Sequence, residues 1–178
     1  MAKWLIDADH SVVKFSIWHF MIANLVSYFG RITGMIQFDP PGINYLSIEA
    51  EIEVRSITSD HQMQDEYLLG PDYFDAEKYP KIIFRSSKVD SATGNRCKVT
   101  GDLDIRGIIQ AVILESEVFG PIKNQFSVKS CIRFNGKTKI NCEDYGIMRN
   151  KRIEGVVFVM GKDVQIDFDI EATLIADQ

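Results

Sequence analysis

Apolar and polar residues alternate with a period of two over much of this 178-residue chain. In the clearest runs, every second residue is apolar from Leu46 to Val54 and again from Ile166 to Leu174. Successive side chains of a β-strand point to opposite faces, so each run predicts a strand with one dry and one wet face. Further extended segments are expected at 13–17, 28–38, 81–89, 98–106, 108–119 and 125–134.

Turn-forming residues separate these runs. The pairs Gly94-Asn95, Asn135-Gly136 and Gly161-Lys162 are typical of the turns of β-hairpins. The five prolines are expected at strand boundaries, because proline cannot donate to a sheet ladder. They are Pro40, Pro41, Pro71, Pro80 and Pro121.

One segment predicts a helix. Ser59 and Gln62 have the spacing of a capping box, the helix body is expected to run through Met63 to Leu69, and Gly70-Pro71 would end it. About eight antiparallel strands with one apolar face must stack as a sandwich or close as a barrel. The long, evenly spaced strands favour an up-and-down barrel, and we expect an all-β fold in a single domain over residues 1–178.

Composition narrows the class of function. A formal net charge of −5 and a pI of about 5.2 argue against a general nucleic-acid or anionic-membrane surface. No apolar run approaches the ~18 residues of a membrane-spanning helix. No signal peptide is visible at the N-terminus, so the cytoplasm is the expected location unless a leader has been trimmed.

The sequence carries no catalytic or metal-binding signature. The three cysteines, Cys97, Cys131 and Cys142, have no zinc or disulfide spacing and are expected to be half-buried strand residues. The acidic pairs lie two residues apart, on what should be wet outer strand faces. A metal site would need all three histidines, His10, His19 and His61, or a borrowed carboxylate. We therefore expect no metal, no cofactor and no enzyme activity.

Several segments together resemble one known family. Residues 4–16, 18–26 and 34–40 are followed by a connector with Asp72-Tyr-Phe-Asp75 and Tyr79-Pro80 before a strand, then by 101–107 and 140–146. In this order they resemble the YceI-like family of polyisoprenoid-binding, lipocalin-like domains. The resemblance implies an eight-stranded antiparallel barrel with one short helix packed beside it. It also implies that the interior holds an isoprenoid or fatty-acid-like chain, and that the protein associates as a homodimer.

Nine residues are expected to face the interior and bind such a ligand: Phe15, Ile17, Phe29, Phe38, Phe84, Leu103, Phe126, Ile132 and Phe168. A basic cluster, Arg149, Lys151 and Arg152, stands out in an acidic chain and is a candidate rim for an anionic head group, against the simpler interpretation of a solvated loop. Period-two patterning cannot distinguish a filled interior from one that holds a ligand. Two alternatives therefore remain open: a small lipid-modifying enzyme using the same cavity, and a ligand-free, stress-related scaffold.

Overall fold

The structure, a computed structural model, describes residues 1–19, 23–123, 125, 128–147, 150–153, 156–159 and 161–175. The first half of the chain forms β1 (Lys3–Ile6), η1 (Ala8–His10), β2 (Val12–His19), β3 (Ala23–Phe29), β4 (Ile32–Gln37), η2 (Ile43–Tyr45), β5 (Ser47–Glu53), η3 (Val54–Ser56), β6 (Ile57–Thr58) and α1 (Gln62–Leu69). The second half forms β7 (Lys81–Thr93), β8 (Arg96–Ile105), β9 (Ile108–Lys123), β10 (Ser130–Asn141), η4 (Cys142–Tyr145), β11 (Asn150–Ile153), β12 (Val156–Val159) and β13 (Asp163–Ile175).

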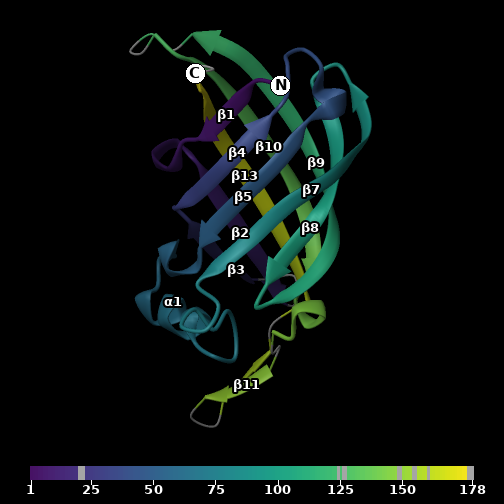
Figure 1. The fold of residues 1–178 in the computed structure, drawn as a ribbon. Coiled ribbons are helices and arrows are strands. Elements are labelled where there is room, and N and C mark those ends of the chain that lie inside the picture. Colours follow the sequence, from purple (N-terminus) through teal and green to yellow (C-terminus); the bar gives the residue numbers. More distant parts are fainter. Residues whose placement is uncertain are drawn as a thin grey trace.

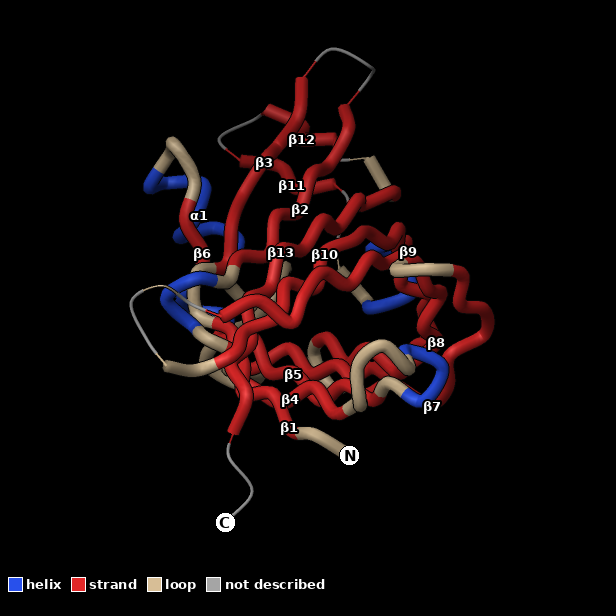
Figure 2. The backbone as a smooth tube through the Cα atoms, turned by 90° about the horizontal axis from the view of Figure 1, so that it is seen from above, coloured by secondary structure: helices blue, strands red, loops and turns tan. Residues whose placement is uncertain are grey.

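The strands close into an antiparallel barrel (Figures 1 and 2). The hydrogen-bonded ring runs β1-β4-β5-β7-β8-β9-β10-β13 and returns to β1. Neighbours around this ring are also near neighbours in sequence, as in an up-and-down barrel. The expected eight-stranded barrel is therefore confirmed, with no open sheet edge around the ring.

Two barrel strands are bent rather than straight. One edge of β13 pairs with β10 along its length, while the other edge pairs first with β2 and then with β1. One bent barrel strand consists of β1 and β2, which the short helix η1 separates. The other consists of β3 and β4, which Gly30 and Arg31 separate. β2 and β3 therefore continue the wall, and Phe15 of β2 and Phe29 of β3 line the interior; β6 pairs with β3 and extends the sheet.

The predicted alternation decides which side chains are inside. On β8, Cys97, Val99, Gly101, Leu103 and Ile105 are buried, while the four residues that alternate with them are more exposed. Complete burial of one such aliphatic side chain contributes about 1.5–3 kcal/mol relative to exposure. A similar pattern recurs on β10, and the buried residues of the described strands form one continuous core.

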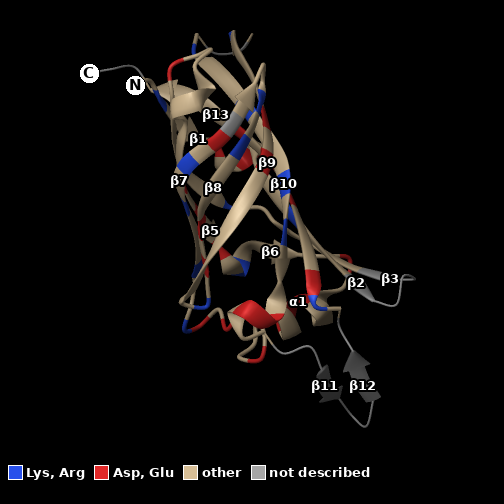
Figure 3. Ribbon diagram, turned by 90° about the vertical axis from the view of Figure 1, so that its right-hand side faces the viewer, with Lys and Arg blue, Asp and Glu red and all other residues tan. Residues whose placement is uncertain are grey.

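The outer wall carries the acidic pairs, as the sequence predicts, and Figure 3 shows Lys and Arg positions as well as Asp and Glu positions along the barrel strands. Lys81 Nζ lies 2.5 Å from Glu51 and Arg96 Nε lies 2.6 Å from Glu117. Both pairs join adjacent strands, β5 with β7 and β8 with β9. Exposed pairs of this kind stabilise a sheet only slightly, so their main effect is to keep the wall soluble.

The predicted turn at Asn135-Gly136 is wrong, because β10 continues through it. A Cβ on Gly136 would lie 2.1 Å from the carbonyl oxygen of Glu115 and 2.8 Å from the ring of Phe168. The glycine is therefore needed for close approach of neighbouring strands, which is the alternative meaning of glycine in a strand. Gly94-Asn95 does form the predicted hairpin, between β7 and β8.

Three further boundaries differ from the prediction. Pro121 lies inside β9, where the register with β10 shifts opposite Ile132 and forms a bulge that tolerates proline. The strand predicted at 125–134 is observed from Ser130 onward, and Val128 is fully exposed. Gly161-Lys162 lies between β12 and β13, which pair with β11 and with barrel strands respectively, so the described residues form no hairpin there.

The predicted helix forms, but not with the predicted cap. His61 is the N-cap residue and makes no side-chain capping bond. The hydroxyl of Ser59 instead bonds locally to the backbone of His61, and Asp65 accepts a 3.0 Å hydrogen bond from the backbone nitrogen of Ser59. A serine next to a turn can satisfy backbone groups in either way, so its position alone did not decide the cap. Among the described helices, none is long and apolar enough to cross a membrane.

Cys97 and Cys131 are free thiols. Cys97 is buried on β8 and Cys131 is half-buried on β10, close to the expectation. Cys142 departs from it, because it is buried in η4 rather than in a strand.

Candidate ligand-binding cavity

The barrel encloses an apolar cavity of about 130 Å³. All eight strands of the ring contribute side chains to its lining, and β2, β3, α1, the connector after α1 and the η4 region complete it. Apart from the hydroxyl groups of Tyr73 and Thr138 and the thiol of Cys142, the lining side chains are hydrocarbon. An enclosed space with this lining excludes charged groups and favours an apolar occupant.

Six of the nine predicted interior residues line this cavity: Phe15, Ile17, Phe29, Phe84, Leu103 and Phe168. Phe38 and Ile132 are buried but lie outside its lining. Phe38 packs on Trp4 with ring centroids 5.9 Å apart, and Ile132 pairs with Ala172 near the end of β13. Phe126 lies outside the described residues. Ligand contact at all nine positions stays a prediction.

The cavity is smaller than most small-molecule sites, which occupy roughly 300–1,000 Å³. Aromatic side chains take up much of the remaining interior. Phe15, Phe29 and Phe74 form a three-way cluster with ring centroids 5.4, 5.7 and 5.6 Å apart. A long apolar chain therefore requires some of these rings to move, because a barrel wall closed by hydrogen bonds cannot widen easily.

One end of the cavity is closed by a segment that strand periodicity did not reveal. We name residues 62–76, comprising α1 and the turns that follow it, the helical cap; Figure 1 shows α1 at one end of the barrel, opposite the N-terminus. Leu68, Tyr73 and Phe74 from this segment line the cavity. The only sequence signal for them was an aromatic pair set between Asp72 and Asp75 in an otherwise polar turn.

The helical cap is held in shape by local backbone hydrogen bonds. Phe74 N donates to Leu68 O at 3.0 Å and Ala76 N donates to Leu69 O at 3.0 Å. Asp75, which has a positive φ of 49°, donates from its backbone to Gly70 O at 2.9 Å. These bonds turn the chain back on the helix end and direct the Tyr73-Phe74 pair into the barrel.

A second closing segment, which we name the η4 cap, spans residues 142–147. Cys142 and Ile147 line the cavity, and Cys142 N donates to Lys162 O at 2.8 Å. Tyr145 is almost fully buried, and burial, aided by Asp144 and Asp104, raises the pKa of its hydroxyl to about 12. This tyrosine is therefore neutral at physiological pH and acts as a packing residue.

Arg106 connects the two caps. It occupies the turn between β8 and β9 with a φ of 57°, and its guanidinium donates to Gly146 O at 2.6 Å and to Pro71 O at 3.2 Å. Pro71 belongs to the helical cap and Gly146 to the η4 cap. One side chain thus holds both closing segments at the same end of the barrel.

Acid–base chemistry has no support in this cavity. No carboxylate, histidine, lysine or arginine is present among the described residues that line it. Cys97 lies outside this lining, and burial raises the pKa of its thiol to about 11, so it is a poor nucleophile at neutral pH. What the lining offers is shape and hydrocarbon surface, which suits binding.

The predicted head-group rim is placed only in part. Lys151 and Arg152 belong to β11, which pairs with β12 in a separate two-stranded sheet. Figure 1 shows β11 at the same end of the barrel as α1. Their side chains, and Arg149 altogether, lie outside the described residues, so the rim stays a prediction.

Comparison with known proteins agrees with this architecture. The model of the YceI-like domain matches residues 4–172. A UPF0312 protein of Staphylococcus aureus is 29% identical over 174 residues, covering 98% of this chain and 99% of the relative. A UPF0312 protein of Vibrio cholerae is 25% identical over 171 residues, covering 95% of this chain and 85% of the relative.

Solved structures show the same fold. BcnA of Burkholderia cenocepacia superposes with a TM-score of 0.80 at 26% identity, covering 94% of this chain and 99% of that one. A polyisoprenoid binding domain of Saccharophagus degradans, implicated in plant cell wall breakdown, reaches a TM-score of 0.69 at 16% identity, covering 97% and 98% of the two chains. That second likeness shows the fold alone. With a family model matched over nearly its whole length, the chain belongs to the YceI-like family.

Proposed function

We propose that this protein binds and carries a long-chain amphiphile, polyisoprenoid or fatty-acid-like, without catalysing a reaction. The observation that carries the proposal is the enclosed, almost entirely hydrocarbon cavity at the centre of a closed barrel. Burying a hydrocarbon chain gains roughly 0.8 kcal/mol for each CH₂ group. Membership of the YceI-like family supports the same ligand class.

Entry of the ligand would begin at the two caps. The helical cap contributes Phe74 to the aromatic cluster. A hydrogen bond from the Arg106 guanidinium to Pro71 O helps to fix this cap at the end of the barrel. Outward movement of this cap would withdraw Phe74 and enlarge the cavity toward the size that a long chain needs. Arg149, Lys151 and Arg152 would then receive the polar head group outside the same end.

A second candidate, a ligand-free scaffold, is favoured by one observation. The cavity holds about 130 Å³, and the interior is otherwise packed with aromatic and aliphatic side chains. A barrel that is stable without a ligand has no thermodynamic need of one. Cytoplasmic location and homodimer formation are further proposals that apply to either candidate.

Native mass spectrometry of freshly purified protein, followed by organic extraction, separates the two candidates. The carrier proposal expects an adduct of isoprenoid or fatty-acyl mass, retained or regained after incubation with such lipids. An unliganded mass that persists after incubation with prenyl and fatty-acyl lipids would reject the carrier and favour the scaffold.

Adjacent residues on β9 provide a matched pair of variants. Val112 lines the cavity, whereas Ile113 is exposed on the outer wall. Val112→Phe adds a ring inside the cavity and should reduce lipid affinity at least tenfold, while Ile113→Phe should leave affinity unchanged. Equal affinity in both variants, each shown to be folded by circular dichroism, would contradict binding in this cavity.

The head-group rim has its own test. Alanine at Arg149, Lys151 and Arg152 together should weaken binding of a prenyl diphosphate but not of the corresponding uncharged prenol. Equal diphosphate affinity in the wild type and the triple variant would reject the rim and leave the cavity proposal standing.

A further inference from the structure

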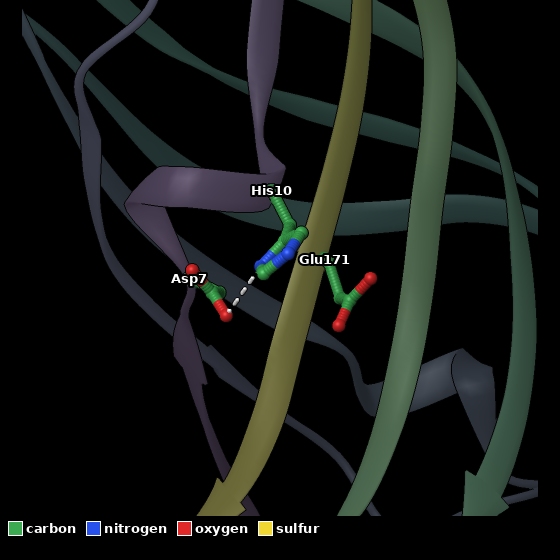
Figure 4. Close-up of side chains that lie close together, drawn as sticks. All are labelled: Asp7, His10 and Glu171. Atoms are coloured by element: carbon green, nitrogen blue, oxygen red, sulfur yellow. Dashed lines mark hydrogen bonds and ion pairs between the residues drawn. The ribbon is translucent and has the colours of Figure 1, made fainter. Parts of the chain in front are cut away.

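A second cluster of chemically distinctive side chains lies on the outside of the barrel, where the chain passes from β1 to β2. Asp7, His10 and Glu171 meet there (Figure 4). His10 Nδ1 is 2.9 Å from Asp7 Oδ2, and one potential ligand atom from each residue lies within 4.8 Å of the others. None of the three belongs to the cavity lining.

Backbone contacts bring the three residues together from two distant parts of the sequence. Asp7 N donates to Glu171 O at 2.8 Å, and Glu171 N donates to the hydroxyl of the buried Ser11 at 3.1 Å. Asp7 Oδ1 accepts a 3.0 Å hydrogen bond from Asp9 N. This bond leaves Oδ2 directed at the imidazole.

The donor set and its spacing fit a metal ion. Zinc takes imidazole nitrogen at about 2.0–2.1 Å and carboxylate oxygen at about 2.0–2.2 Å. Two adjacent ligands of a tetrahedral ion are therefore roughly 3.3–3.5 Å apart. Nδ1 of His10 and Oδ2 of Asp7, which are 2.9 Å apart in a hydrogen bond, would separate by about half an ångström to admit the ion. A ligand atom of Glu171 lies within 4.8 Å of those of Asp7 and His10, and rotation of its side chain would bring it to the ion.

We propose that Asp7, His10 and Glu171 bind one divalent transition-metal cation of the zinc type, with water completing the coordination on the exposed side of His10. Two carboxylates beside one imidazole supply the charge that such a cation prefers. The sequence predicted no metal because Glu171 is 161 residues from His10, and only the closed barrel supplies the borrowed carboxylate.

The proposed ion would have a structural effect. β13 closes the barrel by pairing with β1 on the same edge that η1 interrupts. A metal shared by Asp7, His10 and Glu171 would cross-link that interruption to β13. Because the folded barrel would bind the ion and the unfolded chain would not, the ion should raise Tm.

Zinc titration of untagged protein, previously stripped with EDTA and dialysed, tests the proposal by competition with a chromophoric chelator. We expect one zinc ion per chain and a Tm several degrees higher in zinc. His10→Gln and Glu171→Gln should each raise Kd at least tenfold and remove the Tm increase. His61→Gln, at an exposed histidine outside the cluster, is the matched control and should change neither.

Each other outcome overturns the proposal. Wild-type protein that shows no saturable zinc binding would do so, as would zinc binding that survives both His10→Gln and Glu171→Gln. An equal loss in His61→Gln would place the ion elsewhere. Circular dichroism without zinc checks the fold of each variant, and if His10→Gln does not fold, Glu171→Gln decides, because that substitution keeps the side-chain shape. Lipid binding is measured separately, so failure here leaves the carrier proposal untouched.

Discussion

The barrel wall and the two caps enclose the same cavity but are built by different rules. The wall is a repeating ladder in which alternate residues face inward, and its outer charges pair across strands. The helical cap and the η4 cap are irregular, depend on local turns, and share one tie through Arg106. The wall is therefore expected to unfold only with the whole protein, whereas the caps can open locally.

The largest expected effect comes from Gly136, inside the wall. In Gly136→Ala the new methyl group would meet the backbone of Glu115, which cannot move without breaking the pairing of β9 with β10. We expect a loss of more than about 4 kcal/mol in the free energy of unfolding, or failure to fold. Urea denaturation of Gly136→Ala and of Gly94→Ala measures the difference, since a Cβ on Gly94 meets nothing within 4 Å and only its φ of 61° is strained. Equal losses would contradict the close-approach argument.

Phe74 and Phe134 compare a cap aromatic with a wall aromatic. Phe134 stacks on Phe168 at 5.4 Å, and Phe74 packs on Phe15 and Phe29. Both alanine variants should lose about 3–5 kcal/mol, with Phe74→Ala at the lower end because Phe74 is 9% exposed and Phe134 only 2%. In Phe74→Ala, hydrogen exchange should accelerate more in residues 62–76 than in the barrel strands. In Phe134→Ala, it should not. Uniform acceleration in both variants would show that wall and cap unfold together.

A substitution at Arg106 tests whether its hydrogen bonds couple the two caps. Arg106→Gln loses the charged hydrogen bonds to Gly146 O and Pro71 O, and we expect a cost of about 1–3 kcal/mol. Hydrogen exchange should quicken in residues 70–76 and 142–147 together. Lys81→Gln, which removes an exposed wall ion pair, is the control and should quicken neither segment. Acceleration in only one cap would show that Arg106 does not couple them.

The smallest effect is expected at an exposed carboxylate on the wall. Hydrogen bonds from Lys88 and Thr100 lower the pKa of Asp90, so its stabilising contribution is present above the ordinary pKa of 3.8 and is lost as pH falls through the lowered value. Asp90→Asn should therefore be slightly less stable than wild type at pH 7, with the difference closing as pH drops below 3.8. Urea denaturation at pH 7, 4 and 3 measures this trend. A difference that grows on acidification would contradict the assigned direction.

The contrast between the regular barrel wall and the irregular caps also explains which sequence-based predictions succeeded. The runs beginning at Leu46 and Ile166 placed β5 and β13 and the inward faces of both, because a strand's side-chain period is a local property. The Asn135-Gly136 prediction failed because a glycine required by a neighbouring strand looks the same in sequence as a glycine required by a turn. The capping residue of α1 was missed for a similar reason, since Ser59 had two local ways to satisfy backbone groups.

The sequence by itself determined most of the long barrel strands, their apolar faces and, through its resemblance to a family, the barrel that closes them. Only the tertiary structure decided that Phe74 enters the cavity, that Arg106 joins the two caps, and that Glu171 lies beside Asp7 and His10. The physical reason is the distance along the sequence between the residues that interact. Alternation is a relation between residues two apart, whereas a cavity, a tie and a ligand set are relations between residues that only the closed chain brings together.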